Sequence, residues 1–241
     1  EGGSLPAIVE GNDDGLYVLK FRGAGQGPKA LIAELVAGEL ARALGLPVPE
    51  IVLVELDADL ARTEPDPEIQ HLIRASGGLN LALDYLPGSI TFDPVVDQPD
   101  AGLASAIVWF DAFVSNVDRT ARNTNLLVWH RKLWLIDHGA ALYFHHAWDG
   151  YLARAADPFA RIRDHVLLPF ATLLREADDR LAALLPREAI ERIVAMIPAE
   201  WLGGDAPFAS VDGHREAYAN YLCRRIEAPR AFVEEALRAR V

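Results

Sequence analysis

Two polar stretches in the middle of the chain carry side chains suited to phosphate chemistry. Asp118 and Asn123 follow a long apolar segment, and Asp137 ends a second apolar segment. Carboxylate and carboxamide oxygens are the ligands that Mg²⁺ prefers, and a carboxylate can also orient or deprotonate an attacking hydroxyl. The sequence therefore predicts phosphoryl transfer, with Asn123 and Asp137 as metal ligands and Asp118 beside the acceptor hydroxyl.

The segment between these residues predicts how they come together. Residues 126–136 consist of two apolar runs around a polar turn, a pattern typical of a β-hairpin. If the turn centres near Arg131, Asp137 lies across from about Asn125. The hairpin would then return Asp137 to the side of Asn123, although the two are far apart along the chain.

A lysine inside an apolar strand is a further candidate. Lys20 lies in the strand pattern of residues 16–21, on the same face as Leu16 and Val18. A buried amine costs free energy unless it is paired, whereas a lysine on an edge strand can extend its ammonium group to water. The strand pattern therefore leaves two roles open for Lys20, a phosphate contact and a solvated edge residue.

The elements that must position these residues begin with a β-rich part. A hairpin is expected over residues 7–21, and strands over residues 51–56 and 79–86. Residues 29–44 are rich in Ala and Leu and predict a long helix, which Gly45 ends as a C-cap. The first ninety residues are thus expected to form a small sheet with one long helix.

The rest of the chain is mostly helical. Residues 101–116 predict an apolar helix, helical patterns recur from Asp164 onward, and the charged, proline-containing residues 64–67 are expected to form a solvated loop. The order of elements indicates an α+β fold with two lobes. We expect a small nucleotide-binding lobe over residues 1–88 and a helical lobe over residues 89–241.

The central motif resembles a known family. Residues 118–123, Asp-Arg-Thr-Ala-Arg-Asn, followed by residues 136–139, Ile-Asp-His-Gly, resemble HipA-type kinases and, more distantly, phosphoinositide and protein kinases. Residues 33–49 are similar to the helix that follows the ATP-binding lysine strand of that family, and residues 2–6 resemble its phosphate loop. The helical tail is only generically similar.

The resemblance implies a two-lobed, protein-kinase-like fold that binds ATP and Mg²⁺ and phosphorylates a protein serine or threonine. It assigns a phosphate contact to Lys20 and a catalytic role to Asp118. It also points to Glu34 as the partner of Lys20, whereas helical periodicity places Glu39 on the bulky apolar face. Both carboxylates stay open as partners of Lys20, with Glu34 preferred.

The nucleotide itself is expected to contact two further segments. In the pattern of the family, Gly3 and Ser4 would cradle phosphate with their backbone amides. Asp84 and Leu86 would flank the hinge that reads adenine through the backbone. Both segments also have an ordinary structural interpretation, as a chain terminus and as a strand end.

The sequence departs from the ordinary protein-kinase pattern in several places. It has no Gly-x-Gly-x-x-Gly loop, residues 116–117 are Asn-Val where protein kinases have His-Arg, and residues 137–139 replace Asp-Phe-Gly. The N-terminal region of HipA toxins is also absent from this sequence. Two other functions therefore stay open: a small-molecule phosphotransferase of the aminoglycoside or choline kinase type, and a non-catalytic nucleotide-binding pseudokinase.

The composition limits the classes of partner that the chain can bind. The formal net charge of −12 argues against a general nucleic-acid binder and against docking on anionic lipid, because both need basic patches. No apolar run is long enough to span a bilayer. The single cysteine, Cys223, can form no internal disulfide, which fits a reducing cytoplasm. We expect a cytoplasmic enzyme whose acceptor is a protein or a small molecule.

Overall fold

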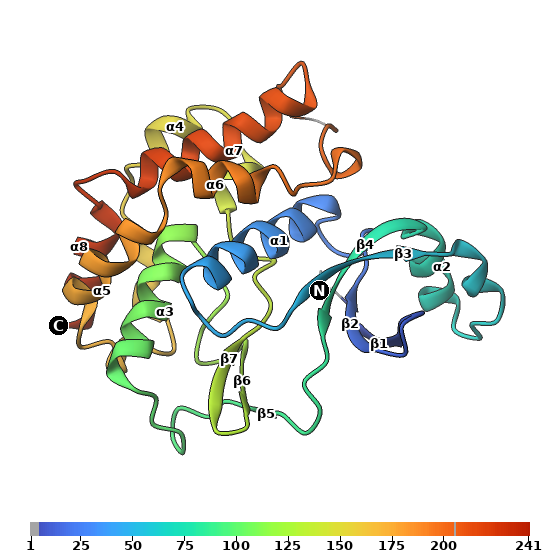
Figure 1. Ribbon diagram of the computed structural model, residues 1–241, viewed down its shortest axis with the longest axis horizontal. Coiled ribbons are helices and arrows are strands. Elements are labelled where there is room, and N and C mark those ends of the chain that lie inside the picture. Colours follow the sequence, from blue (N-terminus) through green and yellow to red (C-terminus); the bar gives the residue numbers. More distant parts are fainter. Residues whose placement is uncertain (1–4, 205) are drawn as a thin grey trace.

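The computed structural model describes residues 5–204 and 206–241, and it begins with an antiparallel sheet. The four strands lie in the order β1-β2-β4-β3 (Figure 1). Their bounds are Ala7–Glu10 for β1, Leu16–Lys20 for β2, Ile51–Leu56 for β3 and Gly78–Asp84 for β4. These strands agree with the predicted hairpin and the two predicted strands, and Asp84 is the last residue of β4.

A long helix, α1, joins the sheet to the helical part of the molecule. It spans Pro28–Ala43, starts after Gly27 with proline in its first turn, and is followed by Gly45 at a φ of 76°. Glycine adopts this left-handed conformation without the steric cost that a Cβ would bring. Buried side chains of α1 belong to one continuous apolar core with those of α3 and α7.

A small helical insertion between β3 and β4 was not expected from the sequence. It consists of the 3₁₀ helix η1, Ala58–Arg62, and helix α2, Pro67–Ala75. The side chain of Asp66 accepts hydrogen bonds from the first-turn amides of α2, and Pro67 occupies the first helical position. The prediction of a solvated loop over residues 64–67 missed that these residues start a helix.

A second sheet carries the predicted hairpin. Strands β6, Leu126–Trp129, and β7, Lys132–Leu135, pair antiparallel beside the short strand β5, Ile90–Thr91. The turn residues His130 and Arg131 both have positive φ, at 49° and 62°. Two such residues form the tight turn that matches the twist of a two-residue hairpin.

The register of this hairpin differs by one residue from the predicted one. The turn centres between His130 and Arg131, so the amide of Ile136 donates to the carbonyl of Asn125 at 3.1 Å. Asp137 therefore follows the residue opposite Asn125 instead of facing it. The difference arises because a two-residue turn has its centre between two residues, not on one.

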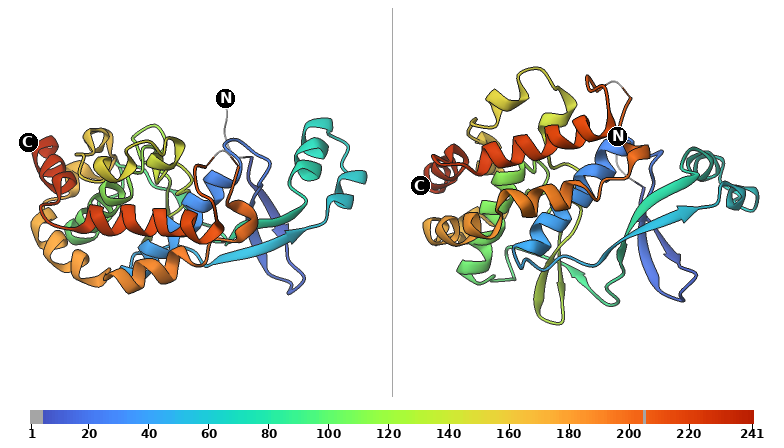
Figure 2. Two further views of the ribbon diagram at one scale, coloured as in Figure 1. Left: turned by 90° about the horizontal axis from the view of Figure 1, so that it is seen from above. Right: turned by 45° about the horizontal axis from the view of Figure 1, so that its top comes forward.

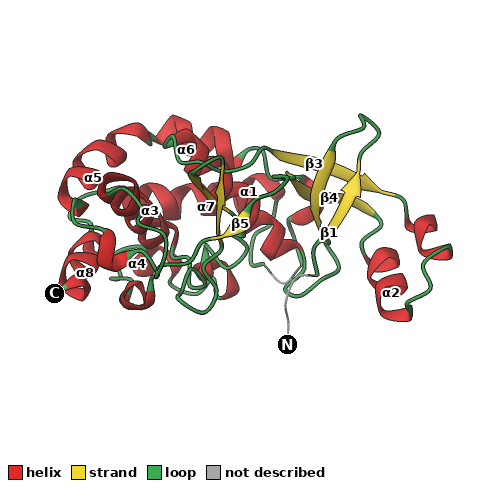
Figure 3. Cartoon of the chain, turned by 90° about the horizontal axis from the view of Figure 1, so that it is seen from below, coloured by secondary structure: helices red, strands yellow, loops and turns green. Residues whose placement is uncertain are grey.

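The remaining chain forms a helical body around α3, Ala101–Val114 (Figures 2 and 3). Trp109 and Phe113 of α3 stack on each other, and Phe232 packs against both at steeper angles, with ring centroids 5.5–5.9 Å apart. None of the helices in the described ranges has the length and apolar character needed to cross a membrane. The later helices are α4, Tyr151–Arg154; α5, Leu174–Leu181; α6, Arg187–Val194; α7, Val211–Ile226; and α8, Ala231–Arg240.

The architecture is thus α+β, with an N-terminal antiparallel sheet and a helical C-terminal region, as the order of elements predicted. Figure 3 shows the four-stranded sheet and the helical body toward opposite ends of the molecule. The predicted site residues are spread over several elements: Lys20 ends β2, Asp118 and Asn123 lie in the loop after α3, and Asp137 follows β7.

Candidate active site

The lysine of β2 lies between two carboxylates from different parts of the chain. The Nζ atom of Lys20 is 2.6 Å from Oε2 of Glu34 on α1 and 2.6 Å from Oδ1 of Asp137 after β7. The side chain of Lys20 is 9% exposed and that of Glu34 is fully buried. The ammonium group therefore does not extend to solvent, and it links the sheet, the helix and the hairpin.

Of the two glutamates left open by the sequence, the structure pairs Glu34 with Lys20. Glu39 lies one turn further along α1, where its carboxylate is 3.6 Å from the guanidinium of Arg42. Helical periodicity alone could not decide this, because the face of α1 with small residues is as deeply buried as its bulky apolar face.

The charges in this cluster shift each other's proton affinities. Burial acts to raise the pKa of Glu34, but the charge of Lys20 and the hydrogen bond from His138 outweigh it and hold the pKa of Glu34 well below its usual range. Burial acts to lower the pKa of Lys20, and the carboxylates of Glu34 and Asp137 outweigh it, so that the pKa of Lys20 is raised. Lys20 and Glu34 therefore form an ion pair in which both groups are charged at neutral pH.

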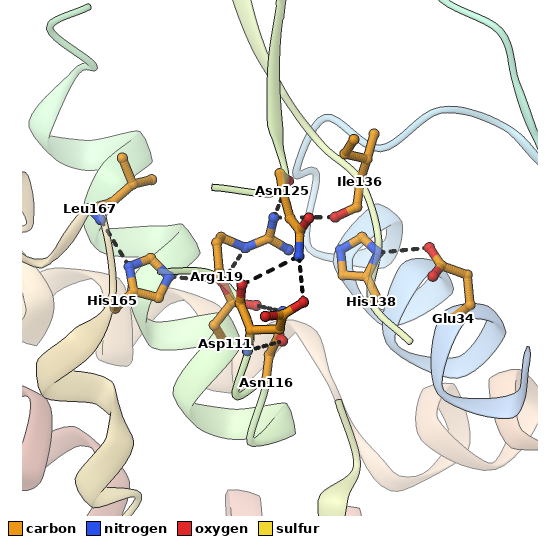
Figure 4. Close-up of polar contacts among 10 residues, drawn as sticks. Glu34, Asp111, Asn116, Arg119, Asn125, Ile136, His138, His165 and Leu167 are labelled. Atoms are coloured by element: carbon orange, nitrogen blue, oxygen red, sulfur yellow. Dashed lines mark hydrogen bonds and ion pairs between the residues drawn. The ribbon is translucent and has the colours of Figure 1, made fainter. Parts of the chain in front are cut away.

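His138 lies behind Glu34. Its Nδ1 atom is 3.4 Å from Oε1 of Glu34, and the close-up shows the ring facing that carboxylate (Figure 4). The ring is fully buried, and its Nε2 atom has no hydrogen-bond partner within the described part of the chain. His138 thus fixes the orientation of the carboxylate that holds Lys20.

The predicted catalytic loop follows α3 and carries Asp118 and Asn123. Oδ2 of Asp118 accepts hydrogen bonds from the amides of Asn123, at 2.7 Å, and of Asn125, at 3.3 Å. The backbone amide of Asp118 donates to Oδ1 of Asn116 at 3.2 Å. The carboxylate of Asp118 is half-buried, so the loop holds it in one orientation while leaving it accessible.

The two predicted metal ligands make different contacts. Asn123 bonds to Asp118, and Asp137 bonds to Lys20, and no hydrogen bond joins Asn123 to Asp137 in the part of the chain that the structure describes. The side chain of Asp137 is 37% exposed, and its backbone has a φ of 55°. That left-handed conformation is uncommon outside glycine, although Asp and Asn tolerate it best, and it turns the chain sharply after β7.

A buried arginine, which the sequence analysis did not single out, ties these loops together. Nε of Arg119 is 2.6 Å from Oδ2 of Asp111, and its Nη1 donates to the backbone carbonyls of Asn125 and Ile136 (Figure 4). One guanidinium thus bridges helix α3, the catalytic loop and the end of the hairpin. Because Arg119 directly follows Asp118 and bonds to the carbonyl of Ile136, which precedes Asp137, it fixes the positions of the two aspartates relative to each other.

Asp111 is the buried anchor of this network. It also accepts hydrogen bonds from Nε2 of His165, at 2.9 Å, and from the amide of Asn116, at 3.0 Å. Burial acts to raise its pKa, but Arg119 and His165 outweigh the burial and hold the pKa of Asp111 well below its usual range. A single carboxylate inside the apolar helix predicted over residues 101–116 was the signal that could have revealed the network, because such a charge requires a partner.

The lysine cluster opens into a cavity of about 150 Å³ between the two sheets. Lys20, Asp84, Leu86 and Asp137 all line it, together with apolar side chains such as Val18. The buried amide of Leu86 donates no hydrogen bond among the described residues, although its carbonyl accepts one from Ser89. The structure therefore brings the predicted hinge and the predicted phosphate-contacting lysine to one cavity. Gly3 and Ser4 lie outside the described residues.

The donor atoms around this cavity suit a magnesium–phosphate group better than a metal held by protein alone. No cluster of three or more His, Cys, Asp or Glu side chains that could hold a metal is found in residues 5–204 and 206–241. Mg²⁺ usually binds through one or two carboxylates, with substrate phosphates and water as the other ligands. Asp137 lines this cavity, and Asn123 lines a neighbouring one that Ile136 also lines, so the two residues supply oxygens of that kind from separate loops.

Comparisons with known proteins identify the family and the fold. The family model described as HipA-like kinase matches residues 1–230. The solved structure of the Helicobacter pylori proinflammatory kinase CtkA superimposes with a TM-score of 0.58 at 16% identity, over 98% of this chain and 97% of that chain. The likeness to CtkA shows a kinase-like fold. No curated protein matches the sequence.

Proposed function

The chain belongs to the HipA-like kinase family, and we propose that it transfers the γ-phosphate of ATP to a hydroxyl, with a protein serine or threonine as the acceptor. The observation that carries the proposal is the position of Lys20, whose Nζ is 2.6 Å from both Glu34 and Asp137. Phosphotransferases of this fold class need a lysine paired with a helix carboxylate and a metal-binding aspartate beside the same phosphates.

In the proposed site, Lys20 contacts the phosphates and Glu34 holds it in place. Because Glu34 is fully buried and shares its carboxylate between Lys20 and His138, it offers a fixed position for the ammonium group. Asp137 is the exposed end of the cluster. When nucleotide binds, the ammonium group can exchange the carboxylate of Asp137 for a phosphate oxygen while keeping its bond to Glu34.

We assign the metal to Asp137 and Asn123. The metal neutralises phosphate charge during transfer. Asp137 has one carboxylate oxygen on Lys20, while Asn123 uses its amide nitrogen on Asp118 and keeps its oxygen free for a ligand. Asp118 receives the proton or orients the hydroxyl of the acceptor, and the amides of Asn123 and Asn125 hold its carboxylate for that role.

We place the nucleotide base in the cavity between the sheets. Adenine is recognised in the proposed mode by backbone atoms after β4, and the unpaired amide of Leu86 is one such donor. In this proposal residues 1–88 form the nucleotide lobe and residues 89–241 the helical lobe. Gly3 and Ser4 would complete the phosphate contacts.

A small-molecule acceptor that carries positive charge, as in the aminoglycoside and choline kinase types, has less support. The cavity that adjoins the catalytic loop on the helical side is lined by three arginines and one aspartate among the described residues. Such a lining repels a cation. No observation in the described residues favours a non-catalytic protein, because Lys20, Asp118, Asn123 and Asp137 are all present.

The proposal is tested by thermal melting together with transfer of labelled γ-phosphate. Mg²⁺ and ATP together should raise the melting temperature more than either alone, because a ligand that binds only the folded state stabilises it by mass action. Labelled phosphate should then appear on protein hydroxyls, with the Asp118→Ala variant as the inactive control. The absence of a melting shift at millimolar Mg-ATP would refute the proposal.

A further inference from the structure

A second cavity begins one residue before the proposed catalytic aspartate. It has a volume of about 320 Å³ and is lined by Ser115 and Val117 of the loop after α3, by the segment that follows β7, and by α7. The amide of Val117 bonds to the carbonyl of Ala140, so this cavity lies where the catalytic loop meets the chain that leaves Asp137. Val117 directly precedes Asp118 in the chain, so a peptide residue bound here would lie within a few residues of a hydroxyl positioned at Asp118.

Three arginines line the cavity, in a chain whose formal net charge is −12. Arg154, Arg161 and Arg225 make no ion pair with any carboxylate in the described part of the chain. Most other arginines in the same ranges do, at distances between 2.5 and 3.8 Å. Asp157 is the single acidic residue in the described lining. The cavity is therefore a local concentration of positive charge.

One of these arginines has a structural role that explains its burial but not its charge. The guanidinium of Arg225 is 3% exposed and donates to the carbonyls of Ala112 and Phe113, in the last turn of α3, and to those of Ala155 and Asp157. These are dipoles, and none of them carries a full negative charge. Arg225 therefore fixes the wall of the cavity, and no carboxylate in the described residues neutralises its charge by an ion pair.

The other two arginines have donors to spare. Nη2 of Arg154 donates to the carbonyl of Ala147, whereas its Nε is buried without a partner among the described residues. Arg161 is exposed at the rim and makes no hydrogen bond in those residues. The exposed ring of Tyr143 and the half-buried ring of Phe159 lie beside them. Guanidinium groups with free N–H donors bind phosphate and carboxylate through paired hydrogen bonds.

We propose that this cavity binds an anionic side chain, phosphate or carboxylate, of a peptide acceptor, and so directs an adjacent hydroxyl of the same peptide to Asp118. The inference rests on the proposed function, since it names the acceptor class of that site. The two aromatic rings favour a peptide, because they offer apolar contact to the residues next to the anionic group. The peptide thus carries an acidic or phosphorylated residue within a few positions of the target serine or threonine.

The test measures peptide binding without ATP, by fluorescence anisotropy. The probes are labelled, degenerate peptide mixtures with a central serine and a fixed phosphoserine, glutamate, alanine or lysine within three positions of it. We expect the wild-type protein to bind the phosphoserine mixtures most tightly, then the glutamate mixtures, and the lysine mixtures least. Inorganic phosphate should compete only weakly, because it lacks the peptide contacts.

Variants then assign the binding to the cavity. Arg161→Ala should weaken binding of the phosphoserine mixtures about tenfold or more, since a hydrogen bond between charged groups is lost. Asp157→Asn should tighten it, because a repelling carboxylate is removed. Arg163→Ala is the matched control, since Arg163 is exposed, lies two residues away and faces Asp164 at 3.8 Å. Its affinity for the peptides should equal that of the wild type.

Equal affinity for the phosphoserine, alanine and lysine mixtures would overturn the inference, and so would an equal loss in Arg161→Ala and Arg163→Ala. The outcome is independent of catalysis, because no nucleotide is present. A protein that binds acidic peptides but shows no melting shift with Mg-ATP would refute the proposed function and leave the anion site standing. A protein that transfers phosphate to peptides regardless of their charge would support the proposed function and refute the anion site.

Discussion

The ammonium group of Lys20 lies 2.6 Å from the carboxylate of Asp137, although 117 residues separate them in the chain. The contact joins the first sheet to the end of the second, and both residues line the cavity between the sheets. The other carboxylate on Lys20, that of Glu34, is fully buried, so the two acids differ in what happens when the lysine is removed.

Replacing Lys20 by methionine should reduce both phosphate transfer and stability. Removal of a buried cation that lacked a partner would relieve a desolvation cost. The structure shows instead that Glu34 would remain buried without its cation, a change that destabilises proteins by about 3–5 kcal/mol. Denaturant unfolding of Lys20→Met, beside a transfer assay, measures the two losses.

The double variant Lys20→Met/Glu34→Gln separates the two roles of the lysine. It removes the uncompensated charge, so most of the lost stability should return while transfer stays low. Glu39→Gln is the matched control on the same helix, because the one ion pair of Glu39 among the described residues is with the partly exposed Arg42. If transfer returned together with stability, Lys20 would be a structural residue only.

The pH dependence of stability should carry the signature of the same pair. The folded-state pKa of Glu34 is depressed, so its contribution to stability is present above its unfolded pKa of about 4.3 and is lost as pH falls through the lower folded value. The folded-state pKa of Lys20 is raised, so its contribution is present below its unfolded pKa of about 10.4 and is lost as pH rises through the higher folded value.

The free energy of unfolding, measured across pH, should therefore differ between the wild type and Lys20→Met. Wild-type stability should fall on acidification below about pH 4.3, and part of that fall comes from Glu34. In Lys20→Met the carboxyl group of Glu34 is buried without a cation, so its protonation should stabilise the fold and reduce the fall. If the variant lost as much stability on acidification as the wild type, the Lys20–Glu34 pair would not contribute to the pH dependence of stability.

The network around Asp111 should govern stability and the alignment of the catalytic loop. Asp111→Asn leaves Arg119 and its charge buried, and we expect a loss of about 3–5 kcal/mol. The double variant Asp111→Asn/Arg119→Met should regain stability but keep a low transfer rate, because the carbonyls of Asn125 and Ile136 lose their common donor. Chemical denaturation and kcat measurements test both parts.

An exposed ion pair gives the control for this network. Arg175 and Glu234 are 3.2 Å apart on the surface, with both side chains more than half exposed. Removal of such a pair changes stability by about 0–1 kcal/mol. A loss of stability in Asp111→Asn no larger than that in Arg175→Ala would contradict the anchoring role of Asp111.

Much of the fold could be predicted because its signals are local. The short apolar runs of β1 and β2 and the glycine after α1 specify their elements within a few neighbouring residues. Helix α2 was missed because its start, Asp66 and Pro67, has the composition of a loop, and its stabilising cap depends on side-chain geometry.

The sequence predicts candidate site residues, but it does not predict the contacts among them. The choice between Glu34 and Glu39 depends on which face of α1 meets the sheet, and residues close in sequence do not determine that. His165 reaches Asp111 from 54 residues away, through a turn of irregular chain. Such contacts follow from the packing of the helical body, for which the sequence shows only apolar periodicity.

The last prediction separates the two aspartates of the proposed mechanism. Asp118 bonds to Asn123 and Asn125 and makes no contact with Lys20, whereas Asp137 bonds directly to Lys20 in the nucleotide cavity. An interaction made only in the transition state lowers kcat without a parallel loss of ground-state binding. Asp118→Asn should therefore keep most of the affinity for Mg-ATP and lose about 10²–10⁴ in transfer rate, the usual contribution of a positioned base.

Asp137→Asn should instead lose the metal-dependent part of ATP binding together with transfer. Its amide cannot replace the charge of the carboxylate, which both the metal and Lys20 require. Calorimetric titration of ATP with and without Mg²⁺, beside transfer rates for both variants, gives the comparison. If Asp118→Asn abolished binding while Asp137→Asn preserved it, the roles would have to be exchanged, since only a residue that contacts the phosphates or their metal can control binding before transfer begins.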